Sequence, residues 1–374
     1  MATYPDASFP VTTMLPDGSW HGGELAYEVD GTGLDHLRMI DREIPTNIPL
    51  GHVLLKIEAC SVNFRDLMLI SGGKTDLPFI PCSEGVGHVL SAAKDVRRLA
   101  VGDRVCPCFF TDQWIDGEKQ HHAAAGALGS ALPGLLQTHL LVPAEGCVKV
   151  PEHLTFLEAA TLPCCGVTAW NALMEEGGLR PGQTVLCQGT GGVSLFALQF
   201  AKMRGATVII TSSSDEKLKQ AKQQYGADHC INYNTGEVVG GTDGGRDYPT
   251  NKDWAAQVVA CTGGRGVDHV VEVAGQFDQS IKALAYGGRV HVVGGLSNSW
   301  QVNVPYSSLI EKNARVSGIS AGSRTMFESM VEAINDHGSM RPVVGETFHF
   351  VKAKSAFEKL AQGTVFGKIC IKMP

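Results

Sequence analysis

The chain has 374 residues, of which 44% are hydrophobic and 18% are charged, with a formal net charge of −7 and a mean hydropathy of +0.01. A chain of this length and composition can bury a large core and is long enough for two domains. Its negative charge argues against nucleic acid or an anionic membrane as a partner, so a small-molecule substrate is expected.

Nothing in the sequence predicts a targeting or anchoring segment. No Lys or Arg precedes Arg38, the chain ends in Lys372-Met373-Pro374, and no apolar run approaches the roughly 18 residues of a membrane helix. We therefore expect a cytoplasmic protein whose eleven cysteines are reduced. The sequence leaves the oligomeric state open, with a homodimer as one alternative.

Short apolar runs separated by glycine and aspartate fill the first part of the chain. They occupy residues 53–57, 85–90, 102–105 and 139–142. Runs of this length, bounded by turn residues, predict strands. The sequence therefore predicts a β-rich domain over residues 1–155.

From about Phe156 helical and strand patterns alternate. Helices are expected over residues 157–173 and 193–204, and strands over residues 185–188, 207–211, 230–233, 268–273 and 289–293. This alternation is typical of a parallel, doubly wound sheet, so the expected fold class is α/β. The glycine-rich stretch 236–253 is expected to be a mobile surface loop.

The end of the chain is expected to return to the first domain. It contains a predicted helix over residues 326–336 and a final strand over residues 367–372. We therefore expect residues 318–374 to complete the domain of residues 1–155, with residues 156–317 forming the doubly wound domain.

The most informative segment runs from Val185 to Ser194, where an apolar strand passes through a glycine-rich turn directly into a helix. Gly189, Gly191 and Gly192 allow a tight turn and a close approach to a pyrophosphate, whose charge the helix N-terminus favours. Ser194 stands where a third glycine is usual, and serine is small enough to replace it. The segment predicts a dinucleotide site.

The strand over residues 207–211 indicates which dinucleotide binds. An NAD site places a carboxylate at the end of this strand, about 20 residues after the glycines, to hold the ribose 2′-hydroxyl. Three serines beginning at Ser212 stand there instead, followed by Lys217, and these groups suit a 2′-phosphate. The predicted cofactor is NADPH, with Asp215 as the alternative carboxylate. Tyr233, at the end of the next strand, either flanks the phosphate or adenine or packs.

Five motifs together resemble the medium-chain dehydrogenase/reductase superfamily. They are Asn63-Phe-Arg-Asp66, Gly102-Asp-Arg-Val105, the segment Leu162–Trp170, Gly226-Ala-Asp-His229 and Gly263–Asp268. The first resembles the Asn-Tyr-Arg-Asp motif of the quinone oxidoreductase-like members. The resemblance covers nearly the whole chain.

This resemblance implies a GroES-like catalytic domain joined to a Rossmann domain, with the active site in the cleft between them. It implies Asn63 as a polar contact in that cleft and Thr168 as a residue that positions the nicotinamide. The expected cofactor-binding residues are Gly189, Thr190, Gly191, Gly192, Val193, Ser212, Ser213, Lys217, Tyr233, Gly294 and Lys368.

The zinc ligands of the alcohol dehydrogenases in this superfamily are largely missing. Asn63 or a neighbour stands where the first cysteine should be, and Ser83 stands where a histidine precedes Glu84. One thiolate, Cys165, and one carboxylate are too few for a catalytic zinc with three protein ligands. We therefore expect no metal, with an unusual site made by Cys82, Cys164 and His88 as the alternative.

Without zinc to polarise an alcohol, hydride addition to an activated C=C bond is the favoured chemistry. The sequence thus predicts an NADPH-dependent, zinc-independent reductase of enones or quinones. Two alternatives stay open: a reductase of an imine or a carrier-bound enoyl thioester, and a non-catalytic NADPH-binding protein.

Other candidates have an ordinary packing explanation beside the functional one. His88 and His139 are candidate proton donors, but a lone histidine on a strand is more often a packed residue. Phe64, Phe109, Phe110 and Trp114 are candidates for an aromatic acceptor pocket, although core filling more often explains any one of them.

Overall fold

The structure, a computed structural model, describes residues 13–14, 20–21, 23–73, 75–119, 125–235, 237–238, 253–294 and 304–374. Contacts divide the chain into two compact units: residues 1–160, 346–364 and 369–374 form the first, and residues 161–345 and 365–368 form the second. Of the expected mobile loop over residues 236–253, all but Glu237, Val238 and Asp253 lies outside the described residues.

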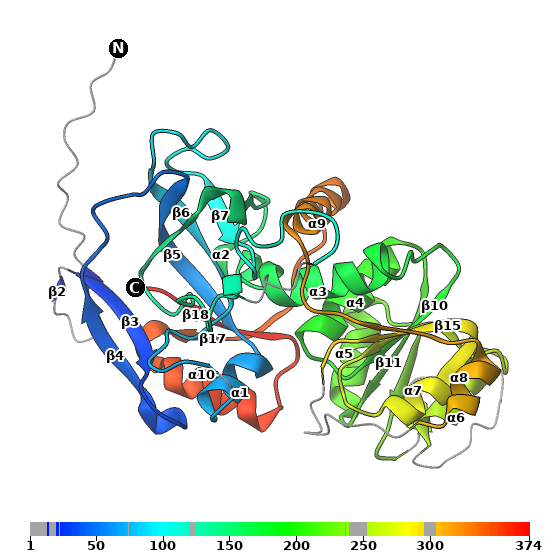
Figure 1. Cartoon of the computed structure of the whole chain (residues 1–374). Helices are drawn as coiled ribbons and strands as arrows, with labels where there is room; N and C mark the ends of the chain where they lie inside the picture. Colours follow the sequence, from blue (N-terminus) through cyan, green and yellow to red (C-terminus); the bar gives the residue numbers. More distant parts are fainter. Residues whose placement is uncertain are drawn as a thin grey trace. The chain divides into compact units, whose positions relative to one another are not determined.

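The first unit is built on an antiparallel sheet (Figure 1). Its strands are β1 (Thr13–Met14), β2 (Trp20–His21), β3 (Glu24–Val29), β4 (Leu37–Arg42), β5 (His52–Val62), β6 (Glu84–Ala92), β7 (Arg104–Pro107), β8 (His139–Pro143), β9 (Cys147–Lys149) and most of β17 (Val344–His349) and β18 (Lys368–Lys372). The main sheet has the order β17-β18-β5-β6-β7-β9, with β8 also paired to β5. The β-rich prediction is confirmed here.

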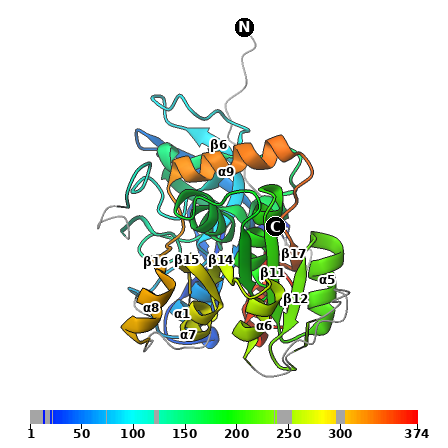
Figure 2. The same ribbon diagram turned by 90° about the vertical axis from the view of Figure 1, so that its right-hand side faces the viewer.

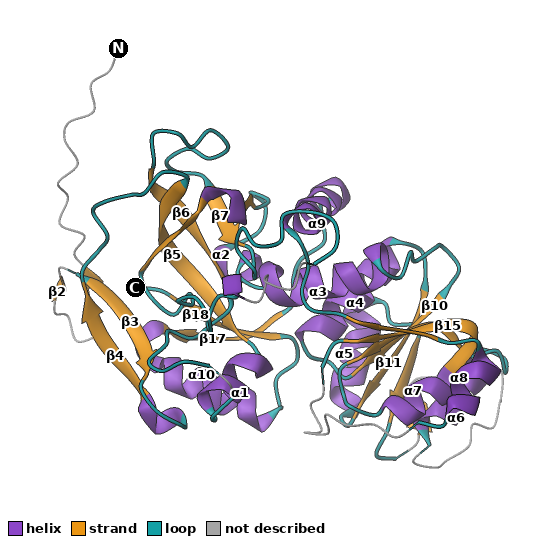
Figure 3. Ribbon diagram, in the orientation of Figure 1, coloured by secondary structure: helices purple, strands orange, loops and turns teal. Residues whose placement is uncertain are grey.

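Helices α1 (Phe64–Ile70), α2 (Phe156–Ala159) and α10 (Ala353–Gln362) belong to the same unit, with 3-10 turns at Leu34–His36, Ala144–Gly146 and Phe350–Lys352. Helices α1 and α10 contact each other although the sequence separates them widely (Figures 1 and 3). Strand β18 pairs antiparallel with β5, so the end of the chain adds a strand to the first unit, as expected.

The second unit holds a seven-stranded, mostly parallel sheet (Figure 2). Its strands are β10 (Thr184–Gln188), β11 (Thr207–Ser212), β12 (His229–Asn232), β13 (Glu237–Val238), β14 (Val267–Glu272), β15 (Leu284–Val292) and β16 (Arg315–Gly318). Its helices are α3 (Val167–Trp170), α4 (Gly192–Met203), α5 (Asp215–Tyr225), α6 (Trp254–Cys261), α7 (Phe277–Ala283), α8 (Tyr306–Lys312) and α9 (Arg324–His337). The strand order β13-β12-β11-β10-β14-β15-β16 confirms the doubly wound α/β fold.

The expected helix over residues 157–173 is interrupted rather than continuous. Helix α2 ends at Ala159, and π-helical turns at Leu162–Gly166 and Asn171–Glu175 flank α3. Pro163 cannot donate a backbone hydrogen bond, and the N–H of Gly166 bonds five residues back, to the carbonyl of Thr161 at 3.3 Å.

The chain returns to the first unit later than expected, after residue 345 rather than after residue 317. The reason is α9, which contacts α3 of the second unit and buries Phe327 and Met330. The sequence shows that this helix is amphipathic but not which unit its apolar face covers.

Four exposed apolar side chains lie on the last two strands of the second unit's sheet and on α8. Strand β16 ends the strand order, and Val316 on it is 45% exposed. Tyr286 of β15 and Tyr306 and Ile310 of α8 are each more than three-quarters exposed. We call these four residues the edge patch. Among the described helices, none is both long enough and apolar enough to cross a membrane.

Candidate cofactor and substrate sites

The glycine turn forms as predicted in the second unit, between β10 and α4. Gly189 has φ +72°, a conformation that favours glycine, and Gly191 caps the helix with extended backbone. A β-carbon at Gly191 would meet nothing within 4 Å. The space over this turn and the first-turn N–H groups of α4 suit a pyrophosphate.

Ser194 replaces the usual third glycine without disrupting the turn. It is buried, and its Oγ donates to the backbone carbonyl of Gln188 at 2.5 Å. The side chain therefore binds the end of the strand that precedes the turn, which explains how a serine fits here.

A segment from near the end of the chain completes this turn. The N–H of Gly367 donates to the carbonyl of Thr190 at 3.0 Å, and Gly367 forms a bridge with Gly191. A β-carbon at Gly192 would come within 2.3 Å of Lys368 Cδ and 2.9 Å of Cys165 Sγ. The stem of Lys368, which is predicted to bind the cofactor, therefore lies directly against Gly192.

The polar residues 212–217 run from the last residue of β11 into the first turn of α5. Ser212 is buried and its Oγ accepts from the N–H of Ser214, whereas Ser213 is exposed. Lys217 is partly buried and donates from Nζ to the carbonyl of Val365 at 3.3 Å. The alternative carboxylate, Asp215, accepts from Asn232 Nδ2 at 2.6 Å.

The other expected residues of the second unit have different surroundings. Tyr233 packs against the apolar cluster that includes Ile209 and Ile231, so packing accounts for at least part of its side chain. Gly294 donates its N–H to the carbonyl of Glu272 at 3.3 Å. Thr168 is buried on α3, a helix that contacts α4.

In the first unit, Asn63 lies at the start of α1 with its amide bound to a carboxylate. Asn63 Nδ2 donates to Glu84 Oε1 at 2.8 Å, and Ser61 Oγ donates to the same oxygen at 2.7 Å. Neither Glu84 nor Ser61 is exposed. Glu84 therefore fixes the side chain of Asn63, the residue that is expected to make a polar contact in the cleft.

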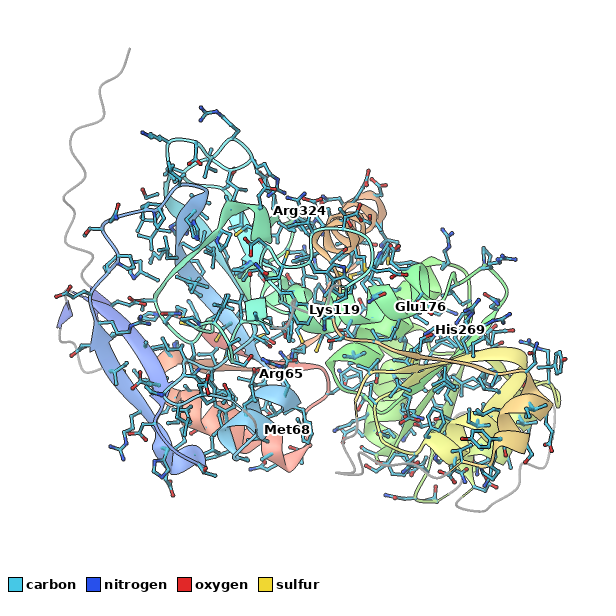
Figure 4. The ribbon with its side chains drawn as sticks, in the orientation of Figure 1. Arg65, Met68, Lys119, Glu176, His269 and Arg324 are labelled. Carbon is cyan, nitrogen blue, oxygen red and sulfur yellow. The ribbon has the colours of Figure 1, made fainter. Side chains whose placement is uncertain are left out.

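The rest of the Asn63–Asp66 motif holds the local structure. Asp66 Oδ2 accepts from the N–H of Asn63 at 2.9 Å, which caps α1. Arg65, which Figure 4 labels, donates to Ser130 Oγ at 3.0 Å, and its guanidinium lies 4.8 Å from the centre of the Phe109 ring. The motif therefore ties α1 to the segment around Ser130.

Over the described residues, the donors around Glu84 do not fit the catalytic zinc considered above. Glu84 accepts hydrogen bonds from Ser61 and Asn63, which are not zinc ligands. Over the residues that the structure describes, no three or more His, Cys, Asp or Glu side chains come together as a metal site. Of the alternative set, His88 pairs with Glu58 at 3.1 Å.

The remaining candidates lie where packing explains them. His139 is 1% exposed and its Nδ1 lies 3.0 Å from Thr138 Oγ1. Burial lowers the pKa of His139 to about 4, which does not suit a proton donor near neutral pH. Phe109, Phe110 and Trp114 are buried, with ring centres 4.6 Å and 6.0 Å apart along the row. Cys106 and Cys108 are buried thiols.

Sequence reasoning missed two groups that shape the nucleotide site. One is the segment of residues 365–367, whose Phe366 ring lies 5.7 Å from that of Tyr225 on α5. The other is the pair Gln188 and Glu272, polar residues that end two apolar strands. A polar residue at the carboxyl end of a parallel strand was the signal available for the second group.

Comparison with known protein families finds two matches. The family described as zinc-binding dehydrogenase matches residues 192–336, and the alcohol dehydrogenase GroES-like domain matches residues 49–152. A zinc-type alcohol dehydrogenase-like protein of Schizosaccharomyces pombe is 37% identical over 352 residues, which cover 91% of this chain and 96% of that protein.

Two solved structures are similar over most of their length. A putative alcohol dehydrogenase from Sinorhizobium meliloti is 37% identical, with a TM-score of 0.82 and coverage of 93% of this chain and 98% of that one. A mycobacterial protein solved in complex with NADPH is 28% identical, with a TM-score of 0.74 and coverage of 93% and 99%.

Proposed function

Because the chain belongs to the medium-chain dehydrogenase/reductase superfamily, among its zinc-type alcohol dehydrogenase-like proteins, we propose that it is an NADPH-dependent, zinc-independent reductase of enones or quinones. It is an alcohol dehydrogenase-like oxidoreductase of an NAD(P)-dependent family. Beyond this family assignment, we propose that the protein prefers NADPH, needs no zinc, reduces an enone or quinone and is cytoplasmic.

The observation that carries the proposal is the arrangement around the glycine turn. Gly191 leaves open space at the N-terminus of α4, and Lys368 lies against Gly192. Lys217 and the serines after β11 supply a cation and hydroxyl groups, which suit a 2′-phosphate. The NADPH-bound neighbour supports the same choice of cofactor.

Bound NADPH would supply a hydride, and the protein's own residues would position the two reactants. Gly189–Val193 would hold the pyrophosphate, with Lys368 beside it, and Thr168 would position the nicotinamide. Asn63, held by Glu84, would give an acceptor oxygen a hydrogen-bonding partner. Because Glu84 and its neighbours are a poor donor set for zinc, an acceptor that is already electrophilic suits this protein better than an alcohol.

Oxidation of NADPH against a panel of enones and quinones tests the proposal. Turnover of at least one class, in protein free of zinc, is the expected result. Turnover only with imines or carrier-bound enoyl thioesters would replace the acceptor class. Tight NADPH binding without turnover of any acceptor would favour a non-catalytic protein, and zinc-dependent oxidation of an alcohol with NAD would overturn the proposal.

A further inference from the structure

Two buried polar side chains end the two central strands of the second unit's sheet. Gln188 is the last residue of β10 and Glu272 is the last residue of β14, and they are 2% and 1% exposed. Gln188 Nε2 donates to Glu272 Oε2 at 2.9 Å. Strands β10 and β14 are neighbours at the point where the strand order reverses, which is where open α/β sheets bind ligands.

The two side chains hold the whole loop that follows β14. Glu272 Oε1 accepts from the N–H groups of Ala274 at 3.0 Å, Gly275 at 2.8 Å and Gln276 at 3.2 Å. Gln188 Oε1 accepts from the N–H groups of Val273 and Ala274, both at 3.2 Å. Four successive backbone donors are thus satisfied by two side chains.

The same residues connect this loop to its surroundings. Ser280 of α7 is buried, donates to Glu272 Oε2 and accepts from Gln188 Nε2 at 2.7 Å. The backbone carbonyl of Glu272 accepts from the N–H groups of Val293 and Gly294 at the end of β15. The ends of β10, β14 and β15 are therefore fixed to one another through Glu272.

We propose that Glu272 and Gln188 are positioning residues for the cofactor, because they set the place of residues 273–276 and of Gly294 beside the glycine turn. This inference rests on the proposed NADPH site. Gln188 directly precedes Gly189, so a shift of its side chain would be passed to the turn itself. Neither residue is assigned a contact with the cofactor; both act through the loops that they hold.

The donor and acceptor pattern gives this inference a sharp test. In Glu272→Gln, the new side-chain NH2 group takes the place of Glu272 Oε2 and faces Gln188 Nε2, so two donors meet. In Gln188→Glu, the new carboxylate faces the carboxylate of Glu272, so two acceptors of like charge meet. The double variant Gln188→Glu/Glu272→Gln restores the match. Its new carboxylate accepts from Val273 and Ala274, and its new amide donates to that carboxylate while its oxygen accepts from the loop.

The experiment measures the Kd of NADPH by fluorescence titration and the Tm of the free protein, using the full chain. We expect each single variant to weaken NADPH binding roughly tenfold or more, and the double variant to recover most of that loss. Glu311→Gln, an exposed glutamate on α8, is the matched control and should bind like the wild type. Ser280→Ala is a milder variant for use if a single exchange prevents folding, and it should weaken binding several-fold.

The outcomes separate the two levels of the inference. Single variants or Ser280→Ala that bind NADPH as tightly as the wild type, whatever their Tm, would overturn the positioning role and leave the proposed function intact. A double variant as impaired as the singles would also overturn it. A wild-type protein that does not bind NADPH would overturn the proposed function and this inference together.

Discussion

Lys217 and Val365 are 148 residues apart in the sequence, yet Lys217 Nζ donates to the backbone carbonyl of Val365 at 3.3 Å. This bond joins α5, the helix that follows the serine-rich end of β11, to the segment that carries Lys368. Lys217, which is predicted to bind the 2′-phosphate, is therefore bonded to the segment that also carries Lys368, the other lysine predicted to bind the cofactor.

We predict that NADPH binds at least tenfold more tightly than NADH and that Lys217→Ala removes most of this preference. One charge-assisted contact with a 2′-phosphate contributes about 1.5–3 kcal/mol, and each 1.4 kcal/mol is a factor of about ten. Fluorescence titration with both cofactors measures the ratio.

Lys219→Ala, an exposed lysine on the same helix, is the matched control and should leave both affinities unchanged. Loss of NADH affinity in Lys217→Ala would show that this lysine acts by holding residues 365–368 rather than by binding phosphate. Equal affinity of the wild type for NADPH and NADH would contradict the cofactor assignment.

We predict that the purified protein holds no stoichiometric zinc and that chelators leave its activity unchanged. The physical reason is that Glu84 accepts hydrogen bonds from Ser61 and Asn63, which are not zinc ligands, and that the described residues bring no three His, Cys, Asp or Glu side chains together as a metal site. Elemental analysis before and after chelation, together with an activity assay, checks both halves. About one zinc per chain, with activity lost on its removal, would refute the prediction.

We predict that stability falls as the pH drops below 6.5 because of His269, which Figure 4 labels, and His291. His269 Nδ1 lies 3.1 Å from His291 Nε2, and burial lowers the pKa of His269 to about 4 and that of His291 to about 3. Well above pH 6.5 both are neutral in the folded and unfolded chain. Below it the unfolded chain binds protons that the folded chain does not, a loss of about 2 kcal/mol per histidine at pH 5.

Urea unfolding at pH 7 and pH 5 measures this effect. In His291→Leu the loss of stability between the two pH values should be smaller by about 2 kcal/mol, since one proton-binding difference is removed. His337→Leu changes an exposed histidine at the end of α9 and should retain the wild-type pH dependence. An identical fall in His291→Leu and the wild type would contradict the role of the buried pair.

The sequence predicted the parts of the site that depend on local pattern. An apolar strand, three glycines and a helix lie within ten residues, so the turn at Gly189–Val193 could be placed directly. The domain boundary after residue 345 could not be placed, because the helical period of α9 does not reveal which unit it packs against.

Contacts between distant residues were also out of reach. Gln188 and Glu272 are 84 residues apart, and each alone resembles an ordinary polar residue at the end of a strand. The position of Lys368 beside Gly192 depends on a chain that leaves the second unit and returns to it. Such contacts follow from topology and not from spacing in the sequence.

We predict that the protein forms a homodimer through strand β16 and the edge patch of Tyr286, Tyr306, Ile310 and Val316. Antiparallel pairing of Arg315–Gly318 with its copy places each Arg315 opposite a glycine, so like charges do not face each other. Val316→Asp and Ile310→Asp should shift the protein to a monomer in analytical ultracentrifugation. Leu50→Asp, at an exposed leucine of the first unit, is the control, and a monomeric wild type would end this hypothesis.

If the glycine turn binds the pyrophosphate, the backbone at Gly191 must approach the phosphates closely. Its φ of −82° suits any residue, and a β-carbon there would meet nothing within 4 Å in the protein itself. Gly191→Val should therefore fold normally, while its side chain fills the space reserved for the phosphates and abolishes NADPH binding. Circular dichroism and the Tm test the first half, and fluorescence titration tests the second.

The neighbouring glycine provides the contrast. A β-carbon at Gly192 would press against Lys368 Cδ and Cys165 Sγ, so Gly192→Val should lower the Tm as well as the affinity. The two glycines are adjacent, so a lower Tm in Gly192→Val but not in Gly191→Val would reflect the contacts that a β-carbon makes only at Gly192. A folded Gly191→Val that binds NADPH as the wild type does would show that the pyrophosphate lies elsewhere, and the reductase proposal would fail with it.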